Sequence, residues 1–560
     1  MIKFFFYIFF FSFSTLGFGL FLNQQILKKN HFSSIGETGL LGLFFIAFYS
    51  TVIHFFLPLS PNLNLYFHVI GIVIFFLNYQ KFFINLKKLD YFIFSLSIVF
   101  AAILFYSHKP NEDFGFYHLP YIVNFTSEKI IFGLNSLQIQ QGWNSIWLNI
   151  HSAFVINTLD YSLTYLLNSI FFIFIISIFS SEIIKNFDSK IIDCKIAFYF
   201  SFLFLIFFLI KFSRLNSYGL DVPGNYLLVI SILYFFKAFQ TDKININYFM
   251  LITIFLLFSA TIRISNLPFL IIIIYLFFKN KIYKQVLFSK FLLLVTIFFI
   301  AWTTQQFIYT SCLIIPNELT CLKTLWYDEN YLKAFSESTL TVNKSYESYT
   351  GDLTMTQYYE NFQWVPTWFF RNLNELLEYV ATFCLPLIIL SIFNKQKITR
   401  IDKYHIPRND LFFLIIIIII ALLLWFYNSP VIRMGNHFIM LLIFLTIVNF
   451  EWFKKMISNK ISKKIVFSLI IFSLIFSGSK NLNRINNINN NSENAPWPYF
   501  HTVSYKTISQ NNFSLNTIIE TGVPQTSVCW DTPIICRTKN FDDLEITRIF
   551  NNYLLIKKKQ

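Results

Sequence analysis

Long runs of apolar residues recur along most of this chain, and they constrain its fold more than any other feature. An α-helix rises about 1.5 Å per residue, so about 20 apolar residues cross the roughly 30 Å hydrocarbon core of a membrane. About fourteen runs approach that length, near 4–22, 37–57, 65–79, 91–106, 158–181, 193–210, 222–236, 247–260, 267–278, 291–308, 374–393, 411–427, 435–450 and 465–478. Hydrophobic residues make up 55% of the chain, more than one soluble core holds. We therefore predict an all-α polytopic membrane protein with about 14 transmembrane helices.

The distribution of positive charge predicts which side of the membrane each loop faces. Lys and Arg gather in alternate loops, at 28–29, 81–88, 185–195, 237–243, 279–290, 395–408 and 454–464. Loops rich in Lys and Arg stay in the cytoplasm, so we expect both termini and the longest loops outside. The first run lacks a small-residue cleavage pattern and leads into further spans, so we interpret it as an anchor, not a signal peptide. These patterns predict a protein of the inner (plasma) membrane whose outer loops face the periplasm or exterior.

The spans and loops divide the chain into six predicted regions. They are N-terminal spans (1–106), a first outer loop (107–157), central spans (158–308), a second outer loop (309–373), C-terminal spans (374–478) and an extracytoplasmic tail (479–560). The second outer loop holds Trp and Tyr residues but few apolar runs, so it is either a folded cap or an interfacial aromatic belt. In the first outer loop, 144–155 is a candidate short re-entrant helix. The stretch RINNINNNSEN at 484–494 is typical of a flexible polar linker.

Composition also bears on the partners of this chain. The excess of 44 Lys and Arg over 29 Asp and Glu does not indicate nucleic-acid binding, because these charges are scattered among short loops between spans. Two closely spaced cysteine pairs, Cys312 with Cys321 and Cys529 with Cys536, fall on the predicted outer side. Disulfides form on that oxidising side, so both pairs are candidate short-loop disulfides. The alternative is that they are free thiols that happen to be neighbours.

Charged residues stand where the outer loops meet the membrane. The stretch NEDFGFYHLP at 111–120 places Glu112, Asp113 and His118 directly after an apolar run. Further charges lie at the outer ends of later spans, namely Arg214, Asp221, Arg263 and Arg433. Ionisable groups at the membrane are costly unless they are paired or hydrated, so their convergence indicates a functional site. The alternative is that each arginine reaches lipid headgroups and each acid is merely solvated.

Carboxylates beside cations at the outer surface, flanked by spans that can hold a lipid tail, suit a polyprenyl-phosphate sugar. An Asp can take a proton from an acceptor hydroxyl or orient that hydroxyl for attack. Arginines stabilise the charge that develops on the departing phosphate. The expected partners are therefore a polyprenyl-phosphate-sugar donor, a glycan, lipid or protein acceptor, and the lipids of the membrane.

The run EDFGFYHLPYIVNFTSEKIIFGLNSLQIQQGWNSIW resembles the first outer loop of the membrane glycosyltransferases of the GT-C fold. One bacterial branch has the pattern Asp-x-Gly-Leu-Tyr-His-Leu, then a Gly turn, Gly-Leu-x-Asn-Leu and Gly-Phe-Asn-Ser-x-Trp. The matching positions here are Asp113, Gly115, Tyr117, His118, Leu119, Gly133, Leu134, Leu137, Gly142, Asn144, Ser145 and Trp147. The similarity continues in GLDVPGN around Asp221, ATIRISNLP around Arg263, SCLIIP from Ser311, SPVIRMG around Arg433 and CWDTPIIC near the end.

The resemblance implies a GT-C-like fold, a catalytic Asp in the first outer loop, a second acid in another outer loop, and a lipid-phosphate sugar donor. Protein O-mannosyltransferases and aminoarabinose transferases share this plan. The resemblance assigns Asp113 as the base or acceptor-orienting group and Asp221 as the second acid. Here four spans precede the catalytic loop, whereas the simplest family layout has one.

The remaining candidate substrate-binding residues come from two sources. The first loop supplies Glu112, Tyr117, His118 and Asn144, although Glu112 does not align with the acid of the family pattern. The charge argument supplies Arg263 and Arg433 as candidates for phosphate contacts. Some relatives use a divalent metal at this loop, but two adjacent acids and one histidine do not establish one. A divalent metal therefore stays open as a cofactor, and we assign no ligands to it.

Two other functional classes stay open at this point. An envelope polysaccharide polymerase or ligase also has many spans and one long outer loop, but its key charges are expected in a later loop. A transporter of lipid-linked glycans is expected to carry charges at mid-membrane and an internal repeat, and the sequence has neither. The leading hypothesis is a glycosyltransferase, transferring a hexose or pentose for cell-envelope biogenesis.

Overall fold

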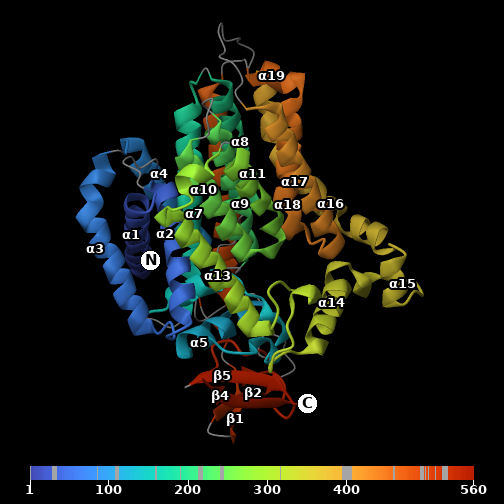
Figure 1. Cartoon of the computed structure of the whole chain (residues 1–560). Helices are drawn as coiled ribbons and strands as arrows, with labels where there is room; N and C mark the ends of the chain where they lie inside the picture. The colour runs from blue at the N-terminus through green and yellow to red at the C-terminus, as the bar shows by residue number, and fades with distance from the viewer. Residues whose placement is uncertain are drawn as a thin grey trace.

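The protein is an all-α polytopic membrane protein with a small β region near its C-terminus, as seen in a computed structural model (Figure 1). The structure describes residues 2–559 apart from 28–33, 85, 108–112, 158–160, 190, 212–218, 240–244, 280, 316, 394–405, 458–460, 492–496, 499, 502, 511–512, 520–526 and 551. Within this part, eleven helices are long and apolar enough to cross a membrane. Two shorter apolar helices, at 246–262 and 264–279, lie among them.

Every predicted apolar run overlaps a helix. The helices that overlap these runs are α1 (Ile2–Gln25), α2 (Ile35–His54), α3 (Pro61–Ile84), α4 (Lys88–Tyr106), α7 (Leu166–Asn186), α8 (Ile192–Lys211), α9 (Asp221–Ala238), α10 (Ile246–Ile262), α11 (Ile271–Lys279, preceded by the 3-10 segment η5, Ile264–Leu270), α13 (Lys290–Thr310), α16 (Trp364–Phe393), α17 (Arg408–Asn428), α18 (Ile432–Asn449) and α20 (Lys463–Asn491). The runs are helical because a backbone inside a membrane must satisfy its own hydrogen bonds. Eleven helices of the described residues have the length and composition of a span, against the fourteen runs in the sequence.

The shorter elements gather at the two ends of the bundle. The first outer loop holds η1 (Phe114–His118), α5 (Leu119–Ser127), η2 (Leu134–Ser136), η3 (Ile139–Gly142), α6 (Ile146–Ala153) and η4 (Tyr161–Tyr165). The second holds η6 (Glu318–Thr320), α14 (Glu329–Asn343), η7 (Tyr346–Ser348) and α15 (Met355–Glu360), which we call the cap. Two small helices complete the set, α12 (Tyr283–Val286) and α19 (Glu451–Ile457).

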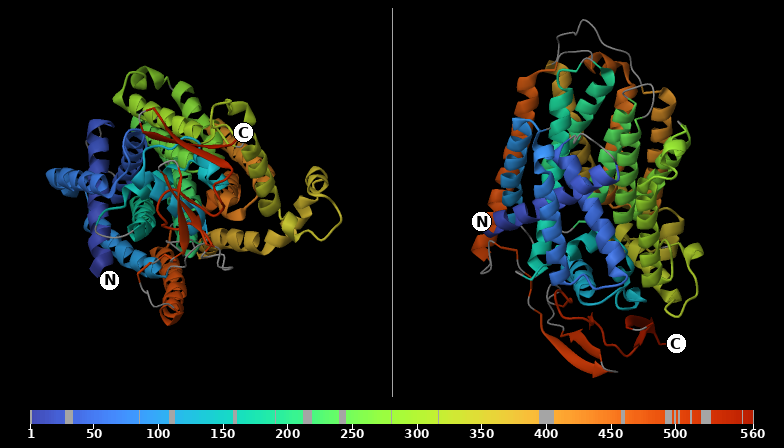
Figure 2. Two further views of the ribbon diagram at one scale, coloured as in Figure 1. Left: turned by 90° about the horizontal axis from the view of Figure 1, so that it is seen from below. Right: turned by 60° about the vertical axis from the view of Figure 1, so that its left-hand side comes forward.

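The first outer loop, the cap and the C-terminal tail share one end of the bundle. Figure 1 places α5 and the strands at the lower end and α19 at the upper end. Seen from below, the strands lie across the lower end while the cap projects to one side (Figure 2, left). The amide of Ile130 donates to the carbonyl of His54 over 3.2 Å, which joins the first outer loop to the end of α2. These three regions, distant in sequence, therefore surround one face.

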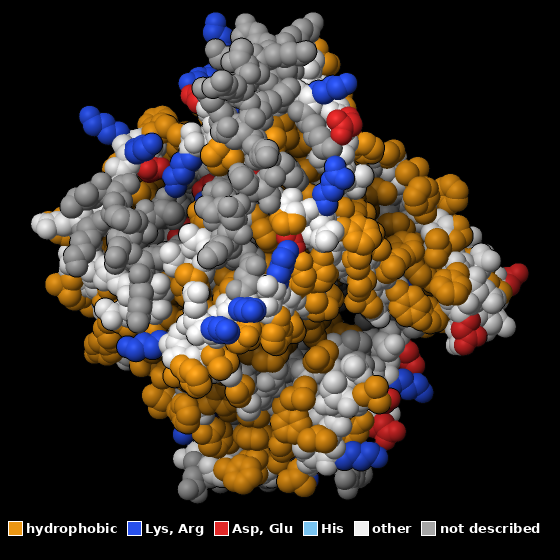
Figure 3. All heavy atoms as spheres, turned by 45° about the horizontal axis from the view of Figure 1, so that its top comes forward, with side chains coloured by type: hydrophobic (Ala, Val, Ile, Leu, Met, Phe, Trp, Pro, Cys, Tyr) orange, Lys and Arg blue, Asp and Glu red, His pale blue; other side chains and the backbone are white. Residues whose placement is uncertain are grey.

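The flanks of the bundle are apolar, as a lipid environment requires. Large exposed hydrophobic side chains lie along the outermost helices, including Leu77 on α3, Leu293 on α13, Phe393 on α16 and Leu423 on α17. Figure 3, tilted so that the upper end comes forward, shows hydrophobic side chains on the flanks and Lys and Arg side chains around that end. Such an apolar belt with charges beyond it is what the bilayer selects.

The tail forms two small sheets next to the first outer loop. Its strands are β1 (Tyr505–Gln510), β2 (Phe513–Ile518), β3 (Cys536–Arg537), β4 (Leu544–Ile549) and β5 (Tyr553–Lys558). β1 pairs antiparallel with β2, β3 pairs parallel with β2, and β4 pairs with β5. The first outer loop pairs with β5 at Phe132, which forms an isolated parallel bridge with Leu555. The amide of Phe132 donates to the carbonyl of Leu554, and the amide of Ile556 donates to the carbonyl of Phe132, each over 2.9 Å.

Both cysteine pairs are bonded. Cys312 joins Cys321 beside the cap with an S–S length of 2.03 Å, and Cys529 joins Cys536 in the tail with an S–S length of 2.10 Å.

Two helix boundaries differ from the sequence-based expectation. α16 begins at Trp364, inside the predicted second outer loop, and α20 continues to Asn491. The predicted linker at 484–494 is therefore helical as far as 491, because extending an existing helix costs far less than starting one.

One cluster of buried charges lies near the upper end, where α2, α7 and α9 meet. The amine of Lys237 donates to Glu182 Oε1 over 2.6 Å, and the hydroxyl of Tyr234 donates to Glu37 Oε2 over 2.6 Å. Glu37 is in the first turn of α2 and Lys237 in the last turn of α9, so the cluster is not at mid-membrane. We call these four residues the closed cluster, since Lys237 and Glu182 are only 8% and 7% exposed.

Candidate active site

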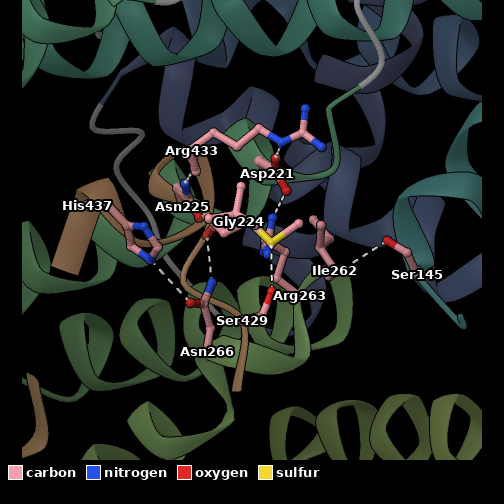
Figure 4. Close-up of polar contacts among 12 residues, drawn as sticks. Ser145, Asp221, Gly224, Asn225, Ile262, Arg263, Asn266, Ser429, Arg433 and His437 are labelled. Carbon is pink, nitrogen blue, oxygen red and sulfur yellow. Dashed lines mark hydrogen bonds and ion pairs between the residues drawn. The ribbon is translucent and has the colours of Figure 1, made fainter. Parts of the chain in front are cut away.

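Asp221 lies between two arginines that come from different helices. It is the first residue of α9, where an acid followed by Pro223 suits the first helical turn. Its Oδ1 forms an ion pair with Nη1 of Arg263, and its Oδ2 lies 3.3 Å from Nε of Arg433 (Figure 4). We call Asp221, Arg263 and Arg433 the open cluster.

The chain positions both arginines by interrupting a helix. Arg263 stands between α10 and η5 in an extended conformation, and Pro268 follows inside η5. Arg433 lies in the first turn of α18, after the turn in which Pro430 follows the end of α17. Proline cannot continue a helix from its own amide, so these breaks put two guanidinium groups at helix ends instead of inside spans.

The open cluster has an unbalanced charge and an accessible face. Asp221 and Arg263 are 15% and 11% exposed, whereas the side chain of Arg433 is 60% exposed. Two guanidinium groups share one carboxylate, so the cluster retains one positive charge. Guanidinium groups bind phosphate oxygens through paired hydrogen bonds. The cluster can therefore accept an anionic group at the side where Arg433 is exposed.

A polar network behind the open cluster fixes its geometry. The amide of Asn266 donates to Ser259 Oγ over 2.8 Å and to the carbonyl of Gly224 over 3.3 Å, and its Oδ1 lies 3.3 Å from Nε2 of His437 (Figure 4). Asn225 donates to the carbonyl of Arg433 over 3.2 Å. This network ties α9, η5 and α18 together, so the three charged residues are held by three helices that also hold one another.

Residue 224 must be small for Arg263 to lie where it does. A Cβ atom added to Gly224 would stand 2.8 Å from Cγ of Arg263 and 3.1 Å from its Cδ. Real Cβ atoms do not approach other carbons so closely. The stem of Arg263 thus crosses α9 at the glycine, which brings its guanidinium group to Asp221.

Asp113 precedes η1, a single π-helical turn from the first outer loop. Such five-residue turns are rare and recur at functional sites. Asp113 is partly exposed and Tyr117 is buried. Burial and the negative charge of Asp113 raise the pKa of Tyr117, while the charges of Arg433 and Arg263 oppose that shift. The phenol of Tyr117 is therefore within electrostatic reach of Asp113 and of both arginines of the open cluster.

His118 ends the same π-helical turn and is neutral at physiological pH. Burial lowers its pKa to about 3, and the positive charge of Arg433 contributes to the shift. A buried imidazole close to a cation cannot add a second positive charge at low cost. His118 therefore fits a positioning role better than a proton-donating one.

Aromatic side chains connect this site to the cap. The rings of Tyr117 and Trp143 lie 5.6 Å apart, and Trp143 lies 5.6 Å from Phe335 on α14. The hydroxyl of Tyr331, also on α14, donates to the carbonyl of Ile139 over 3.1 Å. The first α-helix of the cap, α14, thus packs onto the first outer loop.

The structure brings together most of the predicted site residues, but not all. Tyr117 and His118 lie within electrostatic reach of Arg433, and Tyr117 also lies within reach of Asp113. The side-chain amide of Asn144 donates to the carbonyl of Trp302 over 2.9 Å, so this side chain holds the loop against α13. Its neighbour Ser145 donates to the carbonyl of Ile262 over 2.9 Å, next to Arg263 (Figure 4). Glu112 and Arg214 lie outside the described residues.

Sequence reasoning missed the supporting residues Gly224, Asn266 and His437. Each is uncharged or weakly basic and lies near a charged residue that drew more attention. A usable signal existed for His437, because a buried polar residue inside an apolar run needs a partner. Among the described residues, no three His, Cys, Asp or Glu side chains gather in a way that could hold a metal ion.

The fold and the site together define a polytopic membrane protein with a charged site where several helices end at one face. The chain belongs to the family described as a domain of unknown function (DUF8201), whose family model matches residues 1–440. The matched region contains Asp113 and the open cluster, and the C-terminal tail lies beyond it. Neither a curated protein nor a solved structure matches the chain.

Proposed function

We propose that this protein is a GT-C-like membrane glycosyltransferase, which moves a sugar from a polyprenyl-phosphate donor to a glycan, lipid or protein acceptor. Its site would face the periplasm or exterior of the plasma membrane, with about fourteen crossings of the chain. The observation that carries the proposal is the open cluster: two arginines share Asp221, and one of them is exposed, beside the loop that holds Asp113.

The positive charge of the open cluster favours the phosphodiester donor, and it favours the departing phosphate monoester more strongly. A polyprenyl-phosphate sugar is a phosphodiester with one negative charge, which the excess positive charge of the cluster balances. When the bond between the anomeric carbon and the phosphate oxygen breaks, the departing monoester gains a second negative charge. Cations fixed beside that oxygen stabilise the transition state more than the ground state, which is what accelerates a reaction.

Asp113 would act on the acceptor. Its carboxylate accepts the proton of the acceptor hydroxyl as the oxygen of that hydroxyl bonds to the anomeric carbon, and later releases the proton to water. Tyr117 and His118 lie on the same π-helical turn and would set its position. The polyprenyl tail would remain among the apolar flanks of the outer helices, such as α16 and α17. No water-soluble donor is required.

The test is transfer from radiolabelled polyprenyl-phosphate hexoses and pentoses by membranes that contain the protein. Asp113→Asn is expected to lower transfer by about 10²- to 10⁴-fold, the usual loss when a general base is removed, with protein level unchanged. Glu318→Gln, an exposed acid of the cap, serves as the matched control and is expected to keep full activity. Full activity of Asp113→Asn would remove the catalytic assignment. Transfer only from diphosphate-linked donors would favour a polymerase or ligase.

A further inference from the structure

The tail reaches the candidate active site through Trp530, which lies in the sequence CWDTPIIC. The side chain of Trp530 is completely buried. The backbone amide of Trp530 donates to the carbonyl of Gly115 over 2.9 Å. The preceding residue, Cys529, is bonded to Cys536, which begins β3. β3 in turn pairs with β2. The position of Trp530 is therefore set by both a disulfide and a sheet.

The indole ring fits against the π-helical turn because residue 115 has no side chain. A Cβ atom added to Gly115 would lie 2.3 Å from Cε2 of Trp530 and 2.5 Å from its Cδ2. The ring thus occupies the space that any other residue at 115 would fill. Because protein interiors are close-packed, a ring that lies directly on the backbone of Gly115 leaves that backbone little room to move.

Further aromatic rings pack around this contact. Phe114 lies 6.2 Å from Trp530, and Phe500 from the tail also lies 6.2 Å from it. Phe114 packs on Tyr165 at 5.1 Å. Aromatic pairs at such distances add to the free energy gained from burial alone. The tail and the first outer loop therefore share one small aromatic core, which includes the residue that follows Asp113.

Gly115 lies between Asp113 and Tyr117 on the same turn. We infer that Trp530 is a positioning residue: by packing on Gly115 it holds η1, and with it Asp113, in register with the open cluster, so that the C-terminal tail is a working part of the active site. The effect on transfer rests on the proposed function. The effect on the conformation of η1 does not, which allows the two ideas to be tested separately.

The kinetic test compares Trp530→Ala with Trp530→Phe and with Trp497→Ala. Trp497 is a tail tryptophan that packs on Phe105 and donates to Ser162, away from Gly115, so Trp497→Ala is the matched control. Misplacing a reacting group by about 1 Å costs about 100-fold in rate, so Trp530→Ala is expected to lower kcat by about 10- to 100-fold. KM for the donor is expected to stay within about threefold, because the phosphate contacts remain. Trp530→Phe should recover part of the loss.

Hydrogen exchange of the full-length protein in detergent gives a readout that needs no substrate. Amides of 113–120 are expected to exchange faster in Trp530→Ala than in the wild type, and unchanged in Trp497→Ala. If Trp530→Ala does not accumulate, Gly115→Ala disturbs the same contact from the other side and should give the same two effects. Unchanged exchange at 113–120 in these variants overturns the inference. Faster exchange in a protein whose wild type transfers no sugar supports the inference and counts against the proposed function alone.

Discussion

Two clusters of charged side chains, near opposite ends of the helix bundle, use similar groups in different ways. In the closed cluster the Lys237 amine is bonded to Glu182 and flanked by the ring of Tyr234, and the Tyr234 hydroxyl donates to Glu37. All three charged side chains are almost fully buried. In the open cluster, one carboxylate serves two arginines, and Arg433 is 60% exposed. A cluster whose charges are all buried offers no charged group to a ligand at the surface. One with an excess charge at the surface offers such a group.

The comparison separates stability from activity. Charges buried in a bundle of spans are costly unless they are paired, so pairing in the closed cluster joins α2, α7, α9 and α10. The same pairing in the open cluster holds Arg263 but leaves Arg433 only partly engaged. We therefore expect substitutions in the closed cluster to change the free energy of unfolding, and substitutions at the exposed part of the open cluster to change catalysis.

The largest expected effect is in the closed cluster. Glu182→Leu leaves Lys237 buried without its carboxylate, which should reduce the free energy of unfolding by about 3–5 kcal/mol, measured by thermal unfolding in detergent. Activity per folded molecule should not change. The double substitution Glu182→Leu with Lys237→Met removes both charges and should recover most of the stability. Lost transfer without lost stability would show that this cluster is functional after all.

The next effect is expected at Arg433. Arg433→Ala should lower kcat/KM for the donor by about 10²- to 10³-fold, as removal of a group that stabilises developing charge usually does. Stability should hardly change, because the side chain is largely exposed. Arg433→Lys should keep part of the activity, since it retains the charge but not the paired hydrogen bonds. Lys323→Ala, in the cap region, is the control, and an equal loss there would argue for a general effect of surface charge.

His118 in the first outer loop is expected to make the stability of the protein depend on pH. The pKa of His118 is about 3 in the folded protein and about 6.5 when unfolded, so protonation favours unfolding. Its contribution is complete above pH 6.5 and declines as the pH falls below it, by about 2 kcal/mol at pH 5. His118→Gln should therefore lose less stability than the wild type between pH 8 and pH 5. The pKa of His151 is also lowered, by burial and by His118, so part of the decline should persist. An identical pH dependence in both proteins would contradict the assignment.

The smallest expected effect tests how strictly the open cluster is positioned. Gly224→Ala pushes on the stem of Arg263 and should lower kcat by about 10-fold through displacement of its guanidinium group. Gly478→Ala is the matched control, because its added methyl group would meet Phe100 at an ordinary 3.5 Å. Equal activity of the two variants would mean that Arg263 tolerates movement.

Most of the fold could be predicted from the sequence because hydropathy is a local property of each segment. Each apolar run became a helix for reasons contained in the run itself. The charges of the open cluster were also visible, since Asp221, Arg263 and Arg433 stand out against apolar surroundings. The closed cluster was not anticipated, although Glu37, Glu182 and Lys237 each interrupt an apolar helix. Their pairing depends on which helices are neighbours.

Contacts between distant segments could not be predicted from the sequence, because they too depend on which segments are neighbours in the folded protein. The residues next to Gly115 in the sequence do not indicate that Trp530 packs on it. Those next to Asn144 do not indicate that it bonds to α13. A glycine in a loop has many uses, and only the packed structure selects one. The helical continuation of α20 through an asparagine-rich stretch was missed because composition describes a segment in isolation.

The contact between Trp530 and Gly115 joins an early part of the chain to a late one. Gly115 belongs to the first quarter of the chain and Trp530 to its last part, so the ribosome finishes one long before the other. An unfinished chain holds every charge of the open cluster without the tail that supports η1. The protein would then become fully competent only after its C-terminal segment has been made and delivered to the same side, which delays activity until the whole bundle is assembled.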